Sequence, residues 1–195
     1  YLTGLPEFAD MAGARTGATF ARRFRTTILE PISDNDLLAA LHPFVTEGWQ
    51  VPGGERVYME ASAQRAIVEL SRGEPFLFQL AGERAWYAGT DDLITAEQVA
   101  SGWRGAVHEA ETHVQRILER LPAREREFLE AMAQLPPSER TLTNIARALD
   151  YHRASDAGPT AQRLDLIRRV IRRGRPHYTF RNRAVGAYLE SDWPE

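Results

Sequence analysis

The chain has 195 residues, 43% of them hydrophobic, and a formal net charge of −3, so it is long enough for one or two domains with buried cores. Its lack of cysteine excludes disulfides and thiolate metal sites, and no apolar run or leader-like opening indicates a membrane span or signal peptide. These features fit a reducing cytoplasm. All 24 residues of the Lys and Arg class are arginine, which excludes lysine-based nucleotide or Schiff-base chemistry.

Charge is unevenly distributed along the chain. Residues 1–120 carry 11 arginines and 17 acids, and residues 121–195 carry 13 arginines and 10 acids, giving net charges of −6 and +3. The pattern of apolar residues changes at the same place. We therefore expect a domain boundary near Leu121 and Pro122.

The first residues suggest that the chain is a piece of a longer protein. It begins with Tyr1 rather than methionine, and the segment 1–3 is typical of the end of a buried strand. A short arginine-bearing helix or turn is predicted at 18–25. A connector follows around Glu30, because Pro31 disfavours helix at the residue before it.

Four helices with short loops are then predicted. Ser33 can cap the first, and the second covers Glu60–Arg72, with Gly73 as its stop. Pro75 opens the third, which runs to Ala88, and a Thr95 capping box opens a long fourth helix to about Leu121. A loop is expected at Trp49–Glu55, which contains Pro-Gly-Gly.

The last third has the element order of a winged helix-turn-helix. Helical patterns are predicted at Arg124–Leu135, Thr143–Asp150 and Pro159–Val170, followed by a wing at Ile171–Phe180 and a last helix at Arg183–Glu190, which Asn182 can cap. The predicted fold is therefore mainly α, a helical bundle followed by a winged helix-turn-helix with a small β-wing.

Arginine is concentrated in this part of the chain. Between Thr160 and Arg183 there are eight arginines and one acid, Asp165. Arginines on a recognition helix and wing suit phosphate contacts, because neutralising phosphates releases counterions. They equally suit a solvated face, or a grip on the rest of a larger protein. The candidate DNA-binding residues are Arg163, Arg168, Arg169, Arg172 and Arg175, of which the first four are expected to point largely outward.

No metal site is predicted. His108 and His113 lie near Glu109 and Glu111, but a spacing of five residues does not put the two histidines on one helix face. A solvated helix face is the expected state of this group.

Three segments in fixed order resemble AAA+-related P-loop ATPases, in particular bacterial relatives of the STAND and origin-recognition types. The first comprises GLP at 4–6, ARRF at 21–24 and ILEPISDNDL at 28–37. The second, SRGEPFLFQLAGERAW at 71–86, resembles the G-x-P motif and apolar helix of STAND lids. The third, LPAREREFLEAMAQL at 121–135, opens the winged helix.

The resemblance implies a domain layout and a cofactor. Residues 1–32 would end the ATPase core, 33–120 would form the helical lid, and 121–195 the winged helix. The cofactor would be ATP or ADP with Mg²⁺, held mainly by the core of the same parent chain. Walker A and Walker B motifs are absent here, so we do not expect this portion to hydrolyse ATP alone.

The resemblance also implies roles for single residues. Gly73 and Pro75 match G-x-P, whose proline lies against the nucleotide; an ordinary helix stop followed by a proline start gives the same pattern. Arg22 and Arg23 stand where related ATPases carry an arginine that reaches a γ-phosphate. Thr3 stands where a polar sensor residue is expected.

One position departs from the AAA+ pattern. At the start of the third lid helix, where AAA+ proteins place a sensor arginine, this chain has Glu74, Pro75 and Phe76, which favours a slow switch over fast hydrolysis. The resulting hypothesis is a nucleotide-dependent switch that positions the winged helix for double-stranded DNA, a protein partner or self-association. The alternatives are a DNA-binding regulator without nucleotide and a pure interaction module; no membrane partner is expected.

Overall fold

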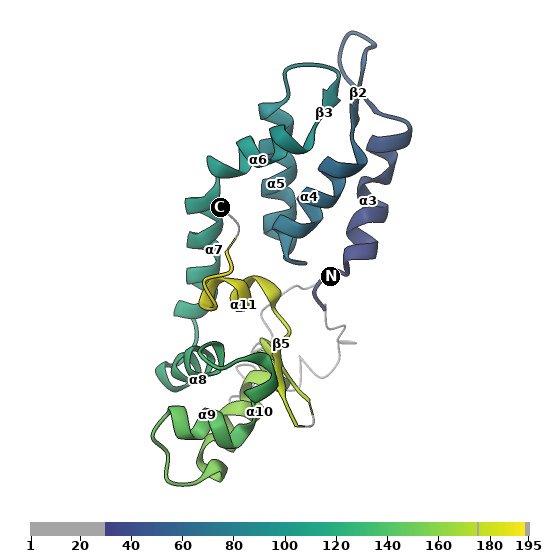
Figure 1. The fold of residues 1–195 in the computed structure, drawn as a ribbon. Coiled ribbons are helices and arrows are strands. Elements are labelled where there is room, and N and C mark those ends of the chain that lie inside the picture. The colour runs from purple at the N-terminus through teal and green to yellow at the C-terminus, as the bar shows by residue number, and fades with distance from the viewer. Residues whose placement is uncertain (1–29, 175, 194–195) are drawn as a thin grey trace, which may run out of the picture. The chain divides into compact units, whose positions relative to one another are not determined.

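The computed structural model describes residues 30–174 and 176–193. Over these residues the protein is mainly helical, with nine α-helices, two small sheets, and a C-terminal β-hairpin that precedes the final helix (Figure 1). The prediction of a mainly α chain with a small β-wing pattern near its end is confirmed at this level. Among the described helices none is long and apolar enough to cross a membrane.

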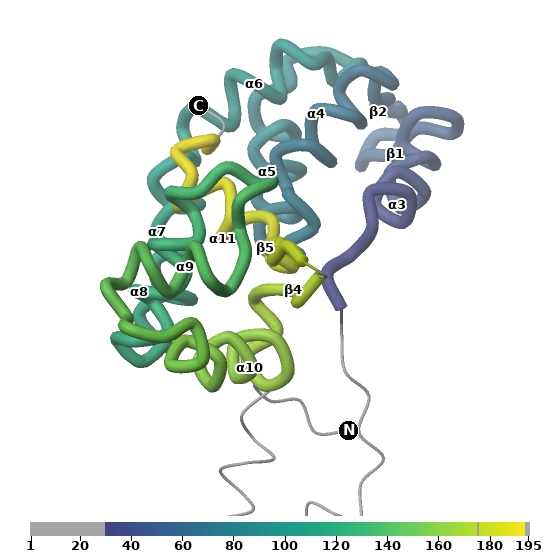
Figure 2. Tube along the Cα trace, turned by 60° about the horizontal axis from the view of Figure 1, so that its bottom comes forward, coloured from purple at the N-terminus to yellow at the C-terminus, as the bar shows by residue number. Residues whose placement is uncertain are grey.

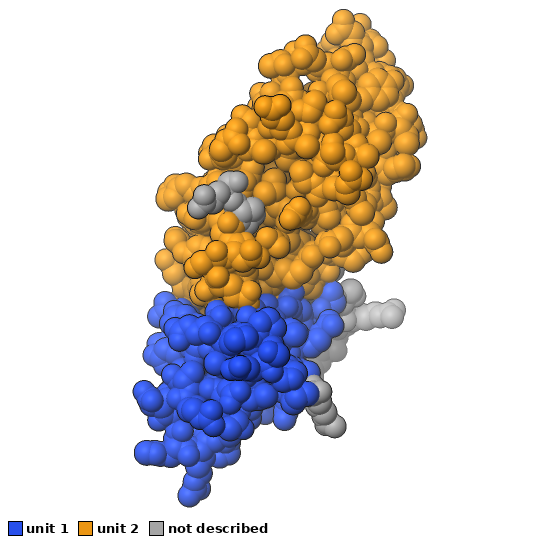
Figure 3. Space-filling model, viewed as in Figure 1, with its two compact units in different colours: residues 1–30, 122–181 blue, residues 31–121, 182–195 orange. Residues whose placement is uncertain are grey.

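The chain divides into two compact units, shown in different colours in Figure 3. Among the described residues, unit 1 contains Glu30 and those from Pro122 to Arg181, and unit 2 contains Pro31–Leu121 and those from Asn182 to Trp193. The chain therefore passes from one unit to the other at three places. The sequence placed the last helix with the second domain, whereas the contacts group it with residues 31–121.

Unit 2 is a helical bundle. Its helices are α3 Asp34–Thr46, α4 Ala61–Ser71, α5 Pro75–Ala88, α6 Ala96–Arg104, α7 Val107–Glu119 and α11 Arg183–Leu189. Helix α4 contacts α3, α5 and α6, α5 also contacts α6, and α11 contacts α7. Figures 1 and 2 show α3, α4 and α5 side by side. Leu37, Ile67, Leu77 and Trp103 are among the fully buried side chains. Each such side chain contributes about 1.5–3 kcal/mol by leaving water.

A three-stranded sheet in unit 2 corrects part of the prediction of a loop at Trp49–Glu55. β1 (Trp49–Gln50) pairs antiparallel with β2 (Arg56–Met59), and β2 pairs parallel with β3 (Leu93–Ile94). Of the predicted loop, Trp49 and Gln50 are strand, whereas residues 51–55, which include Pro-Gly-Gly, are the loop between β1 and β2. The parallel strands β2 and β3 are separated in the sequence by α4 and α5, so no local sequence pattern predicts their pairing.

Local capping signals are confirmed, but one predicted helix is broken. Ser33, Thr95 and Asn182 each accept a hydrogen bond from a backbone N–H in the first turn of their helices, and Thr95 and Gln98 form the predicted capping box. The long fourth helix, however, is interrupted at residues 105 and 106 and becomes α6 and α7. Gly102 and Gly105 weaken helical propensity there, and the Ala106 N–H bonds to the Trp103 carbonyl instead.

Unit 1 follows the predicted element order. It contains α8 (Ala123–Ala133), α9 (Leu142–Ala148), α10 (Gly158–Leu166) and the antiparallel hairpin of β4 (Ile171–Arg173) and β5 (Tyr178–Phe180), with 3-10 turns at Pro137–Glu139 and Ala154–Ala157. Its core includes the fully buried Phe128, Leu129, Ile145 and Leu164. α10 ends four residues before the predicted Val170, because Arg169 takes a left-handed backbone conformation with φ 57°.

Candidate functional site

The turn between α4 and α5, residues 72–75, is a sharply built corner. Arg72 ends α4 with φ 48° and Gly73 follows with φ 76°, so two consecutive residues are left-handed. Glu74 is then the N-cap of α5, and its N–H donates to the Ser71 carbonyl at 2.8 Å. Pro75 occupies the first turn of α5, where its missing N–H leaves no hydrogen bond unmade. This corner carries the predicted G-x-P residues.

Only glycine fits at position 73. A Cβ built there would lie 2.8 Å from the Ile32 carbonyl oxygen and 2.9 Å from a terminal guanidinium nitrogen of Arg183. The Gly73 carbonyl also accepts a hydrogen bond from the Ile32 N–H at 3.2 Å. The close approach, together with the positive φ, explains the glycine independently of its role as a helix stop.

The Glu74 side chain connects the corner to other parts of unit 2. Its Oε1 lies 3.2 Å from Nε2 of His113 on α7, and its Oε2 accepts a longer hydrogen bond, 3.5 Å, from the Asn182 side chain. The His113 imidazole stacks on the Phe76 ring, with centroids 4.3 Å apart. His113 thus packs at the corner, and no group of three or more potential metal ligands occurs among the described residues.

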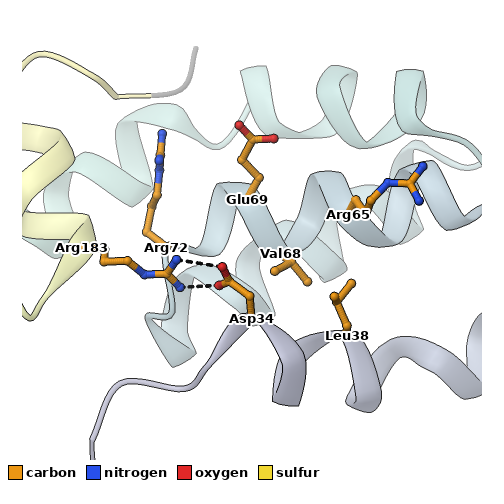
Figure 4. A pocket seen from close by; sticks show the side chains of 7 residues that line it. All are labelled: Asp34, Leu38, Arg65, Val68, Glu69, Arg72 and Arg183. Carbon is orange, nitrogen blue, oxygen red and sulfur yellow. Dashed lines mark hydrogen bonds and ion pairs between the residues drawn. The ribbon is translucent and has the colours of Figure 1, made fainter.

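A hollow of about 320 Å³ lies beside the corner and is lined mainly by α3 and α4 side chains (Figure 4). On one side Arg183 donates two hydrogen bonds to the Asp34 carboxylate, one of them 3.0 Å long. The hydrogen bond from Arg183, assisted by the charges of Arg183 and Arg72, holds the pKa of Asp34 below its usual value of 3.8. The lining residues are Asp34, Leu38, Arg65, Val68, Glu69, Arg72 and Arg183.

Charges around this hollow are nearly balanced. Arg183 is paired with Asp34, and Arg72 lies 3.5 Å from the Asp192 carboxylate. Arg65 and Glu69 stand one turn apart on α4, where opposite charges attract. The hollow therefore offers little excess positive charge to an anion.

The structure brings together some of the predicted nucleotide-site residues. Gly73 and Pro75 form the corner, with Gly73 buried and Pro75 exposed. Thr3, Arg22 and Arg23 lie outside the described residues, so their predicted roles stay predictions.

In unit 1, Glu125 organises two of the candidate DNA-binding arginines. Its carboxylate accepts hydrogen bonds from Nε of Arg163 at 3.1 Å and Nε of Arg168 at 2.8 Å. The side chains of Glu125 and Arg168 are 4% and 12% exposed, whereas that of Arg163 is 52% exposed. The contact with Arg163 links α8 to α10, and the largely buried contact with Arg168 links α8 to the segment that follows α10.

Two further arginines of this segment are also paired internally. Arg169 and Arg181 both contact the Glu30 carboxylate, and Arg181 donates to Asp165 at 3.1 Å. The expectation that Arg168 and Arg169 point largely outward is therefore wrong for the orientation of their side chains. The acids that hold them come from distant parts of the sequence.

The hairpin carries the freer positive charges. Arg172 and Arg173 on β4 are exposed, and in the described part of unit 1 neither makes an ion pair. Arg173 was not among the candidate residues, and Arg175 lies outside the described residues. Glu125 was not identified as a functional or structural residue from the sequence. Its position on the same helical face as Phe128, Leu129 and Met132 could have indicated a buried carboxylate that needs a partner.

No protein-family model, curated protein or solved structure matches this chain.

Proposed function

We propose that this chain is the lid and winged-helix portion of an ATP-binding switch protein of the AAA+/STAND type. Unit 2 supplies the lid, and its corner at residues 72–75 contacts ATP or ADP. Mg²⁺ and the phosphates are held by a P-loop core whose motifs are not in this sequence, so this portion does not hydrolyse ATP on its own. Unit 1 is the winged helix that the nucleotide state positions for DNA or a protein partner.

The geometry of the corner is the observation that carries this proposal. A helix stop followed by a helix start requires only one residue with a relaxed backbone. Here Arg72 and Gly73 are both left-handed; glycine adopts this conformation readily, but Arg72 is strained in it, and such strain concentrates at functional positions. The result is an exposed proline ring on a backbone fixed by the Ile32 hydrogen bond. A rigid apolar ring of this kind suits contact with a flat base or a ribose.

The element order of unit 1 supports its assignment as a winged helix. α8, α9 and α10 form the three-helix part, with α10 in the place of the recognition helix, and β4 with β5 forms the wing. The wing presents Arg172 and Arg173 to solvent.

Nucleotide titration tests the proposal. The assay is calorimetry of ADP and ATP with the protein in which this chain is joined to its Walker A core. Pro75→Ala is compared with Gln79→Ala, which changes an exposed residue one turn later on α5. We expect Pro75→Ala to weaken nucleotide binding about tenfold, the loss of roughly 1.4 kcal/mol of contact, and Gln79→Ala to bind like wild type. Equal affinities for all three proteins would contradict the proposal.

A second candidate function is DNA binding through unit 1 without any nucleotide. It is favoured by the two exposed arginines on β4, which have no acid partner in the described part of unit 1. Because Arg163 and Arg168 are held by Glu125, the wing would supply most of the phosphate contacts. Such binding reads little sequence, since phosphate contacts carry no base information.

Fluorescence anisotropy with a random duplex across a salt series tests this candidate. The double variant Arg172→Ala/Arg173→Ala is compared with Arg124→Ala/Arg153→Ala, which removes the same charge from two other exposed positions of unit 1. Losing two phosphate contacts should reduce the slope of log affinity against log salt by about 2. Equal losses in both variants, or no binding at low salt, would contradict DNA binding by the wing, and the latter would favour a protein partner.

A further inference from the structure

The corner at residues 72–75 lies in contact with segments adjoining all three places where the chain passes between the units. These places are Glu30–Pro31, Leu121–Pro122 and Arg181–Asn182. Two of the three begin the new unit with proline, whose ring fixes φ and so stiffens the passage.

Each of these segments is tied to the corner within unit 2 itself. The first begins at Pro31, and the Ile32 N–H donates to the Gly73 carbonyl at 3.2 Å. The second follows α7, whose His113 contacts the Glu74 carboxylate at 3.2 Å. The third begins at Asn182, which reaches the same carboxylate at 3.5 Å.

Glu74 is the member of the corner that joins two of these segments through one side chain. Its carboxylate is only 21% exposed, so its contacts compete weakly with water. Two further contacts reinforce the arrangement. The Arg183 guanidinium lies beside Gly73 and donates a hydrogen bond to Asp34. Gln115 on α7 donates to the Tyr188 hydroxyl on α11 at 2.7 Å. α7 and α11 are therefore linked directly as well as through Glu74.

We infer that Glu74 is a positioning residue that fastens α7 and the start of α11 to the corner, so that one side chain restrains the segments of unit 2 that lead to its boundaries. This role belongs to the chain alone and does not depend on the proposed nucleotide. Any contact that moves Glu74 acts on α7 and on the start of α11 together, and through the corner backbone on Ile32.

Hydrogen–deuterium exchange of the 195-residue chain, without ligand, tests this role. The variants are Glu74→Ala, Glu74→Gln, which keeps the side-chain shape but removes the charge, and Glu83→Ala as the control. Glu83 is an exposed glutamate on the same helix and makes no ion pair in the described part of unit 2. The measured segments are 31–34, 110–121 and 182–187, with α6 as the internal reference.

We expect Glu74→Ala to speed exchange about tenfold in all three segments, since hydrogen bonds to a charged group restrain local opening by that order. Glu74→Gln should give a smaller increase in the same segments, and α6 and Glu83→Ala should match wild type. Wild-type protection at 110–121 and 182–187 in both Glu74 variants would overturn the inference. An equal rise in α6 in both variants would also overturn it, because it would show a general loss of stability.

Discussion

Replacing Gly73 by alanine tests the corner geometry most sharply. The backbone there has φ 76°, and placing a Cβ-bearing residue in the left-handed region costs about 1–2 kcal/mol. The new Cβ would also lie 2.8 Å from the Ile32 carbonyl oxygen, a backbone atom that moves only if the connecting segment shifts. Losing the Ile32–Gly73 hydrogen bond in that shift removes about 1 kcal/mol more. The expected destabilisation of unit 2 is therefore about 2–3 kcal/mol.

Tryptophan fluorescence during urea unfolding measures this change in the right unit. All four tryptophans, at positions 49, 86, 103 and 193, belong to unit 2. With a urea dependence of about 1–2 kcal/mol per molar for a unit of this size, the midpoint should fall by about 1–3 M. The control Gly82→Ala lies inside α5 with no atom within 4 Å of the new Cβ, so it should stabilise by about 0.5–1 kcal/mol. If Gly73→Ala matches wild type within 0.5 kcal/mol, the reasoning about the corner is refuted.

Three further changes have defined outcomes. Glu125→Ala should destabilise unit 1 by about 3–5 kcal/mol in circular dichroism unfolding, because it leaves Arg168 poorly solvated and without this carboxylate, whereas exposed Glu127→Ala should stay within about 0.5 kcal/mol of wild type. The Arg183 hydrogen bond is the main cause of the lowered pKa of Asp34, so the ionised carboxylate stabilises the folded state above pH 3.8 and this stabilisation is lost below that pH. In Asp34→Asn the free energy of unfolding should therefore fall less steeply as the pH is lowered through this range. A pH dependence identical to that of wild type would contradict the stabilising role of the Asp34–Arg183 pair. Burial raises the pKa of Tyr178 above 10.0, so the neutral phenol stabilises the folded state below pH 10 and this stabilisation is lost as the pH rises further. In Tyr178→Phe the free energy of unfolding should not show this decrease above pH 10.

The sequence predicted the features that depend on neighbours in the chain. Ser33, Thr95 and Asn182 were identified as helix caps because a cap and its target amide lie within one turn. Pro75 and Gly73 marked the corner for the same reason. The hairpin of β4 and β5 lies within the wing predicted at Ile171–Phe180.

Features that depend on distant partners were not predictable in this way. β2 and β3 pair in parallel across two intervening helices, and β3 has only two residues, too few to show an alternating pattern. Glu74 meets His113 and Asn182 only after folding, and nothing near Glu74 in the sequence indicates those contacts. Likewise, the inward pairing of Arg168 is decided by Glu125, which lies on another helix.

The most direct test of the proposed nucleotide switch is the DNA affinity of the proposed ATPase, in which this chain is joined to a P-loop core, measured with ATP and with ADP at one fixed salt concentration. Coupling between two sites typically changes affinity 5- to 150-fold. We predict that the two nucleotides give affinities at least about fivefold apart, and that Pro75→Ala reduces this difference while Gln79→Ala preserves it. DNA affinity that is the same with ATP, with ADP and without nucleotide would contradict the account.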